Sequence, residues 1–210
     1  MKSYHSIEKN INDYIGQYVY GFDKIDGSNF RAEWNQKLSK KSHFTNGFKK
    51  FGTRTEMIKH ASNPFCKAID IFEEKYSEHL NKIFRENKIF KGIDIITVYG
   101  EFFGKNSFAG QHNWNEELDL IIFDMFLYKK DFLKPGDFID TFEHLDIPRV
   151  IYQGFLDRKI INNVISNEYK LKEGVVFKGT KENKVFMVKV KTQEWLNKVR
   201  ELYGENNNIE

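Results

Sequence analysis

Hydrophobic positions along this chain follow two spacings, one typical of β-strands and one typical of helices. Short runs rich in aromatic and β-branched residues predict strands at residues 17–22, 28–34, 93–103, 118–127, 150–154, 174–178 and 185–191. Apolar residues at helical spacing predict a long amphipathic helix over residues 64–87, and shorter helices over 138–145, 156–165 and 193–203. Strands and helices are therefore mixed along the whole chain.

Residues 22–30, which read FDKIDGSNF, place one lysine, Lys24, at the end of a predicted strand. The Asp26-Gly27 pair predicts a tight turn, after which a second strand returns. A lysine amine is a nucleophile only when it is uncharged, and an exposed amine titrates near ~10.4, so desolvation or a nearby cation is required. The alternative interpretation is a surface hairpin with an ordinary exposed lysine.

Residues 36–60 form the most basic part of the chain, with Glu56 as the only acid among them. Phe44, Phe48 and Phe51 are interleaved with the basic residues. Basic groups track phosphates and aromatic rings stack on bases, so this segment is a candidate nucleic-acid contact. The alternative is a solvated loop whose phenylalanines point inward. The basic residues are Lys37, Lys40, Lys41, Lys49, Lys50, Arg54 and Lys59.

Composition limits the class of protein. The chain has 210 residues, 40% hydrophobic and 30% charged, which predicts one folded domain over residues 1–204 with a frayed tail at 205–210. The net charge of +3 means that any basic surface must come from local segregation of the charged residues.

Cys66 is the only cysteine, so no disulfide can form within the chain, and this fits a reducing compartment. We expect a cytoplasmic location, or host cytoplasm if the protein is viral, and no membrane contact, because no signal peptide or spanning segment is evident.

Charged residues at strand ends mark a candidate site. Glu101 ends a near-continuous apolar strand, and a carboxylate there is costly without a partner, so it should face a pocket. Lys189 and Lys191 alternate with Val188 and Val190, so the two lysines share one strand face and repel each other unless an anion lies between them. The alternative is a charged, exposed edge strand. The chain has no P-loop and no zinc-ligand spacing.

Five short motifs stand in order and together resemble those of the covalent nucleotidyltransferases, the superfamily of polynucleotide ligases and messenger-RNA capping enzymes. KIDG at residues 24–27 resembles motif I (KxDG), and YGEF at 99–102 resembles motif III. LIIFDM at 120–125 resembles motif IIIa, EGVV at 173–176 resembles motif IV, and KVK at 189–191 resembles motif V. The resemblance covers nearly the whole chain.

Two residues narrow the resemblance to one class. Asn29 stands three residues after the motif I aspartate, where DNA ligases and capping enzymes usually have arginine and nick-sealing RNA ligases of the phage class usually have asparagine. Arg54, in GTRT, also resembles an arginine of that RNA ligase class. The resemblance therefore implies an ATP-dependent RNA ligase for RNA repair. It implies an α+β fold with an ATP-grasp-like nucleotidyltransferase core, antiparallel-rich sheets, flanking helices and a nucleotide cleft between the sheets.

The resemblance also implies roles for individual residues. Lys24 attacks the α-phosphate of ATP to form lysyl-AMP, AMP passes to a 5′-phosphate end, and a 3′-hydroxyl then displaces it. Mg²⁺ is the implied metal, with Mn²⁺ able to substitute, and Asp26, Glu101 and Glu173 are the implied metal-binding acids. The catalytic residues are Lys24, Lys189 and Lys191. The nucleotide contacts, with Phe123 stacked on adenine, come from Asp23, Ile25, Asn29, Arg54, Glu101, Phe123, Glu173, Lys189 and Lys191.

The resemblance ends near motif V, so we expect no separate C-terminal substrate domain. Either residues 36–60 grip the substrate, which would be RNA ends in a nicked or bridged duplex, or an accessory protein does so. Three alternatives stay open: a DNA ligase or end-joiner with the same chemistry, a GTP-dependent enzyme, and a non-catalytic nucleic-acid-binding relative. The intact motif lysines and glutamates argue against the last of these.

Overall fold

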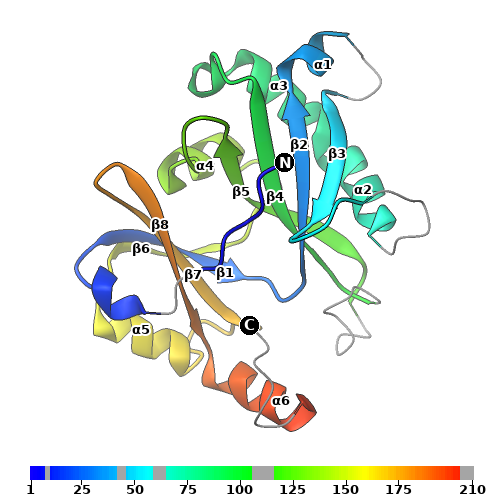
Figure 1. Ribbon diagram of the computed structural model, residues 1–210. Coiled ribbons are helices and arrows are strands. Elements are labelled where there is room, and N and C mark those ends of the chain that lie inside the picture. The colour runs from blue at the N-terminus through cyan, green and yellow to red at the C-terminus, as the bar shows by residue number, and fades with distance from the viewer. Residues whose placement is uncertain (8–9, 42–45, 59–64, 106–115, 204–210) are drawn as a thin grey trace. The chain divides into compact units, whose positions relative to one another are not determined.

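Two four-stranded antiparallel sheets organise the chain (Figure 1). We call them sheet A, with strand order β6-β1-β7-β8, and sheet B, with strand order β3-β2-β4-β5. The computed structural model describes residues 1–7, 10–41, 46–58, 65–105 and 116–203. These divide into a sheet B unit (Met1–His5, Asp26–Leu133 and Asp137–Ile147) and a sheet A unit (Ser6–Ile25, Lys134–Gly136 and Pro148–Glu210). The predicted mixture of antiparallel sheets and flanking helices is confirmed.

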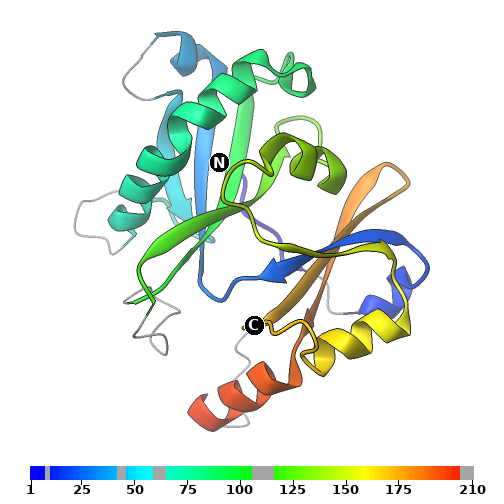
Figure 2. The same ribbon diagram turned by 180° about the vertical axis from the view of Figure 1, so that it is seen from behind.

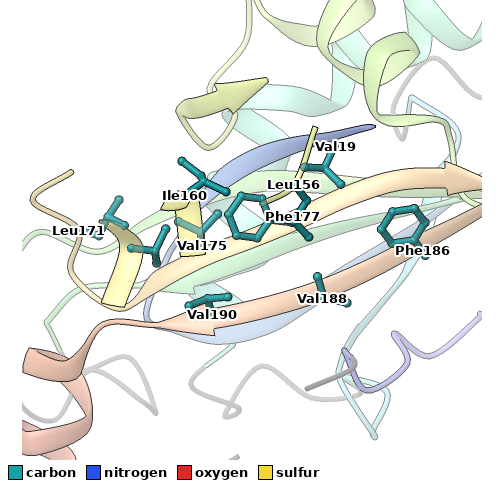
Figure 3. Close-up of a cluster of buried hydrophobic side chains, with 10 residues drawn as sticks. Val19, Leu156, Ile160, Leu171, Val175, Phe177, Phe186, Val188 and Val190 are labelled. Carbon is teal, nitrogen blue, oxygen red and sulfur yellow. The ribbon is translucent and has the colours of Figure 1, made fainter. Parts of the chain in front are cut away.

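Sheet A is formed by β1 (Tyr18–Lys24), β6 (Val150–Phe155), β7 (Gly174–Lys181) and β8 (Lys184–Lys191). β7 and β8 form a hairpin around Glu182 and Asn183, which both have positive φ, as the two-residue turns of twisted hairpins require. One face of the sheet packs on α5 (Arg158–Ile165), whose first turn is capped by the Asp157 side chain. The resulting core is shown in Figure 3. Its buried residues are Val19, Leu156, Ile160, Val164, Leu171, Val175, Phe177, Phe186, Val188 and Val190.

Sheet B is formed by β2 (Ser28–Asn35), β3 (Phe48–Thr53), β4 (Ile95–Phe103) and β5 (Asp119–Leu127). A continuous helical stretch lies along one face of it (Figure 2): α2 (Cys66–Phe72), a π-helical turn (Glu73–Ser77) and α3 (Glu78–Glu86). Four aromatic or apolar residues at near-helical spacing turn toward the sheet and are buried. They are Phe72, Tyr76, Leu80 and Phe84. The helix predicted over residues 64–87 is therefore confirmed, although Pro64 lies outside the described residues.

Among the remaining helices, those near residues 138–145 and 193–203 follow the predictions with small shifts, whereas the helix at Gln36–Lys41 and strand β3 lie in residues 36–60, for which no helix or strand was predicted. Helices are present at α1 (Gln36–Lys41), α4 (Pro135–Phe142) and α6 (Gln193–Tyr203), and 3₁₀ turns at Ile11–Tyr14 and Lys88–Phe90. The tail at 205–210 lies outside the described residues, and the prediction of one domain over residues 1–204 stays a prediction. None of the helices in the described part of the chain is long and apolar enough to cross a membrane.

The interpretation of residues 22–30 as a hairpin is wrong. β1 pairs with β6 and β7, whereas β2 pairs with β3 and β4, so the Asp26-Gly27 turn joins strands of two different sheets. Gly27 packs closely against β4, because a Cβ there would lie 2.5 Å from the Phe102 carbonyl oxygen. An Asp-Gly signal identifies a sharp reversal but not the strands that pair after it.

Base stacking by the phenylalanines of residues 36–60 is also wrong for the rings that are described. Phe48 is buried, and both Phe48 and Phe51 contact the Phe72 ring of α2, at centroid separations of 4.9 and 6.0 Å. Both rings therefore belong to the core of the sheet B unit. Phe44 and Lys59 lie outside the described residues. Lys49 and Lys50 are exposed on β3, and Lys50 pairs with Glu33.

Candidate active site

Lys24 is the last residue of β1, and the sheet A register aligns it with the two other predicted catalytic lysines. Lys24 pairs with Gly174 of β7, which pairs in turn with Lys191 of β8. The next row consists of Phe22, Val176 and Lys189. Residues directly opposite each other share a sheet face. Sheet A therefore brings Lys24, Lys189 and Lys191 onto one face, away from the Val188 and Val190 side chains in its core.

A single buried carboxylate joins two of these lysines. Glu173, 3% exposed, precedes β7, and its Oε2 accepts a hydrogen bond from Lys24 Nζ at 2.7 Å. Its Oε1 lies 3.2 Å from Lys191 Nζ. A buried carboxylate needs such partners, since an isolated charge in a low-dielectric site is strongly destabilising. Glu173 therefore lies between Lys24 and Lys191. The anion expected between Lys189 and Lys191 stays a prediction.

Gly174 allows this cluster to form. A Cβ at residue 174 would lie 2.1 Å from the Val190 carbonyl oxygen, so any side chain would separate β7 from β8. The absence of that side chain lets the strands approach between Lys24 and Lys191. The glutamate-glycine pair of the EGVV motif therefore combines the carboxylate with the close backbone contact that positions it.

Asp23 and Ile25 flank the nucleophile candidate. Asp23 Oδ2 lies 3.6 Å from Arg149 Nη2, and the Asp23 backbone N–H donates to the Arg149 carbonyl. Burial raises the pKa of Asp23, while Arg149 and Lys172 oppose that shift. Ile25 and Asp26, both half-buried, follow β1 in the chain. The structure thus places Asp23 in an ion pair beside Lys24.

The other predicted contacts gather on sheet B. Asn29 of β2 lies directly opposite Glu101 of β4, so the two share a face. Asn29 Oδ1 is buried and has no hydrogen-bond partner among the described residues. Buried side-chain oxygens are nearly always paired, so this orphan acceptor marks a position where a ligand donor would be accommodated. Arg54 is exposed and follows Thr53, the pairing partner of Phe30, at the same end of the sheet.

A β-bulge places Phe123. Tyr99 pairs with Asp124 and Gly100 pairs with Ile122, which leaves Phe123 as the extra residue on β5. Bulges re-aim a side chain locally. The Phe123 ring is half-buried, and the Tyr4 ring meets it edge-on at a centroid distance of 5.1 Å. Tyr4 is itself held by a 2.9 Å hydrogen bond from its hydroxyl to Asp124 Oδ2, and burial next to that aspartate raises the pKa of Tyr4 well above its usual range.

Two buried cations were missed by the sequence analysis. Lys178, 4% exposed, pairs with Tyr20 and shares the face of the three predicted lysines, with its Nζ 5.0 Å from the Phe22 ring centroid. Strand alternation from Gly174 through Val176 could have identified it. Arg31 on β2 is 3% exposed, donates to Ser3 Oγ at 2.9 Å, and has an Nε without a partner among the residues described. Burial lowers the pKa of Arg31.

The acidic side chains near the lysines offer a metal ion few direct ligands. Within the described ranges, no cluster of three or more His, Cys, Asp or Glu side chains could enclose an ion. Glu173 is instead a single buried carboxylate beside lysines. That fits Mg²⁺, which dehydrates reluctantly and is often bound through one or two carboxylates, waters and substrate phosphates. Asp26 and Glu101, the other predicted metal-binding acids, belong to the sheet B unit.

Comparison of structures finds the same fold in solved RNA ligases of Naegleria gruberi. The form solved with PPi has a TM-score of 0.68 and 15% identity, covering 96% of this chain and 58% of that one. A lysine-to-alanine variant solved with ATP and Mn gives 0.67, with 15% identity and coverages of 93% and 58%. A glutamate-to-alanine variant solved with AMP and Mn gives 0.66, with 15% identity and coverages of 94% and 58%. The chain thus spans less than two thirds of the length of these proteins.

Sequence comparison gives the family. No curated protein sequence matches the chain. The family model described as RNA ligase matches residues 17–191, which begin one residue before β1 and end with the last residue of β8. All the motif residues identified above fall within that range. The fold and this match together show that the chain belongs to the RNA ligase family.

Proposed function

We propose that this protein is an ATP-dependent RNA ligase that joins 5′-phosphate and 3′-hydroxyl RNA ends through a lysyl-AMP intermediate on Lys24. The observation that carries the proposal is the cluster of Lys24, Glu173 and Lys191, with contacts of 2.7 and 3.2 Å around one buried carboxylate. A structural lysine would need no second cation beside its partner. A lysine that must lose its proton benefits from one, because a nearby cation favours the neutral amine.

The first step needs Lys24 in its neutral form. The ammonium group first gives one proton to water. The neutral Nζ then forms a bond with the α-phosphorus of ATP as the bond to pyrophosphate breaks, and the nitrogen gives its second proton to water as the phosphoramidate forms. Positive charge near the phosphates stabilises the charge that develops in this transfer. Lys189 and Lys191 are assigned to that role, and Lys178 adds a further cation to the same face.

We assign the adenosine contacts to sheet B. The orphan Asn29 Oδ1 would accept a hydrogen bond from a nucleotide hydroxyl, and Glu101 opposite would do the same. Phe123, half-buried at its bulge, would stack on adenine. Arg54, exposed directly after β3, would contact a phosphate of ATP or RNA. Asp23 and Ile25 would orient Lys24 through the backbone of β1.

Mg²⁺ is the proposed metal, with Glu173 as its main protein ligand through water and Asp26 and Glu101 as further acids. Related ligases solved with ATP and Mn support both the nucleotide and a divalent ion. The ion would neutralise phosphate charge when bound.

RNA is the proposed partner, as ends held in a nicked or bridged duplex. Asn29 and Arg54 favour RNA over DNA, and RNA ligases are the structural relatives. Exposed Lys49 belongs to the basic segment that would contact the strand, and an accessory protein would supply any further grip. A cytoplasmic location is proposed, consistent with a single cysteine in the chain.

The decisive experiment is transfer of label from α-labelled ATP to the protein. Lys24→Ala should abolish it, while Lys159→Ala, which removes an exposed lysine of the same unit, should leave it unchanged. Mass spectrometry should then find one AMP on Lys24. Label on the Lys24→Ala protein would remove the nucleophile assignment.

A second assay separates RNA from DNA ligation. A nicked duplex with RNA on the 3′-hydroxyl side should be sealed faster than an all-DNA nick under the same conditions. Preference for the DNA nick would support the DNA ligase alternative instead, and binding of either duplex without protein labelling would support the non-catalytic one.

A further inference from the structure

The first residues of the chain lie across sheet B, and Figure 1 shows them in front of β4 with α3 behind the sheet. Hydroxyl groups of two tyrosines hold them there. The Tyr99 hydroxyl of β4 donates to the Lys2 carbonyl at 3.0 Å, and the Tyr4 hydroxyl donates to Asp124 Oδ2 of β5 at 2.9 Å. Tyr4 is 8% exposed, so its ring is part of the packed interior of the sheet B unit. No function has been given to Tyr4 so far.

Tyr4 contacts two consecutive residues at the β-bulge of β5. Its ring centroid lies 5.1 Å from that of Phe123, at an interplanar angle of 81°, and its hydroxyl reaches the next residue, Asp124. Consecutive side chains of a regular strand point to opposite faces, so a single tyrosine would meet only one of them there. The bulge turns both side chains toward Tyr4. Asp124 Oδ1 also accepts from the Met125 N–H at 2.9 Å, so the carboxylate that holds Tyr4 is itself fixed to the backbone.

Tyr4 itself has little freedom to move. Its ring centroid lies 4.8 Å from that of Tyr99, 5.3 Å from that of His5 and 5.6 Å from that of Phe132. The Phe123 ring is only half-buried and keeps an exposed part. A fixed, buried ring is therefore paired with a partly exposed one. Edge-to-face contact between two aromatic rings is a favourable geometry, so the fixed ring restrains the exposed one.

We propose that Tyr4 is a positioning residue, which holds the Phe123 ring in the plane on which the adenine of ATP stacks. This inference rests on the adenine contact assigned to Phe123 in the proposed function. Stacked rings attract each other over a narrow range of orientations, so a Phe123 ring that turns freely stacks on adenine for only part of the time. Tyr4 precedes residues 17–191, the range of the family match, and none of the five motifs contains it. Its role follows from its contacts on β5.

The test measures binding of α,β-methylene-ATP by calorimetry with Mg²⁺ present, because the link between the α- and β-phosphates of this analogue does not break. Tyr4→Leu removes the ring and the hydroxyl, so it should bind the analogue about threefold to tenfold more weakly than the parent does. Inorganic tripolyphosphate has no base to stack, so its affinity should change by less than about twofold. Tyr4→Phe keeps the ring and should lose only about twofold in affinity for the analogue.

The control variant is Tyr128→Leu, which alters a tyrosine of the same unit that is 50% exposed and should bind the analogue as the parent does. A Tyr4→Leu protein with the parent's affinity for the analogue would overturn the proposal. An equal loss for the analogue and for tripolyphosphate would overturn it too, since that result would mean a general disturbance of the unit. If Tyr4→Leu does not fold, Tyr4→Phe is compared with the parent, and an unchanged affinity for the analogue would overturn the proposal.

A second comparison asks whether Tyr4 acts through Phe123. Phe123→Ala alone should weaken binding of the analogue more than Tyr4→Leu does, and adding Tyr4→Leu to it should cause no further loss. A further loss of the same size in the double variant would overturn the proposal. Unchanged binding in Phe123→Ala would remove the adenine assignment and this inference with it. If the parent binds the analogue but takes no label from α-labelled ATP, the proposed ligase function fails, and these comparisons still decide the role of Tyr4.

Discussion

The two sheets satisfy their polar groups in opposite ways. On sheet A, both oxygens of the buried Glu173 carboxylate are engaged, by Lys24 and Lys191. On sheet B, Asn29 Oδ1 is buried without a partner among the residues that the structure describes. An unpaired buried acceptor costs about 1–3 kcal/mol. The first site is therefore stable without a ligand and must be broken for chemistry, whereas the second is completed only when a donor arrives.

This contrast separates stability from function at the two sites. Changes to the sheet A cluster should affect folding and activity together, because its charges stabilise one another. Changes to the sheet B acceptor should affect ligand binding alone. The following expectations test that difference, beginning with the largest effect.

Replacing Glu173 with Gln should have the largest effect. The variant leaves Lys24 and Lys191 close together without their shared anion, so both lose their fixed positions. We expect protein labelling by α-labelled ATP to fall by about 10²-fold or more. Glu168→Gln, which alters an exposed glutamate of the same unit, is the control. Labelling within threefold of the parent would show that the carboxylate does not organise the site.

Gly174→Ala should mainly reduce stability. The added Cβ would lie 2.1 Å from the Val190 carbonyl oxygen, which is backbone and cannot rotate away, so β7 and β8 must separate. We expect the free energy of unfolding to fall by about 2–3 kcal/mol in denaturant titrations. Gly136→Ala should cause no loss, since its Cβ would meet only the end of the Tyr20 side chain at 3.1 Å. If Gly174→Ala and the parent had the same free energy of unfolding, the β7–β8 hairpin would tolerate the separation of its two strands.

Asn29→Ala should weaken ATP binding without reducing stability. It removes an acceptor that has no protein partner to lose, so the free energy of unfolding should stay the same or rise slightly. The affinity for ATP, measured by calorimetry, should fall about tenfold. Asn35→Ala on the same strand should do the reverse, because the Asn35 side chain accepts from the Lys37 and Leu38 N–H groups. A loss of stability in Asn29→Ala with unchanged affinity for ATP would show that the Asn29 acceptor serves folding and not ligand binding.

The smallest effect is expected at Asp23. Burial raises its pKa in the folded state, so the aspartate adds most to stability below its unfolded pKa, and that contribution is lost as pH rises through the folded pKa. Asp23→Asn should therefore be slightly more stable than the parent at pH 7, by less than about 1.4 kcal/mol. The gain should vanish near pH 3. Thermal unfolding at both pH values measures it, and a larger gain at pH 3 would contradict the sign.

The pattern of residues within one segment was enough to predict several features of the structure. The strand carrying Lys24, the long helix and the face shared by Lys189 and Lys191 all follow from spacing along one segment, because neighbours in sequence set the side-chain direction. The KIDG, EGVV and KVK motifs also marked the residues that sheet A brings together. By contrast, the inward direction of Phe48 and Phe51 depends on α2, a distant segment.

What the sequence by itself determined is every described strand except β3, the order of the motifs and the identity of the nucleophile candidate, since each depends on residues a few positions apart. Only the tertiary structure decided that the Asp26-Gly27 turn joins two sheets, that a bulge turns out Phe123, and that Glu173 lies between Lys24 and Lys191. These depend on which strands pair and in which register. Register is set by packing across the whole unit, which no short stretch of sequence contains.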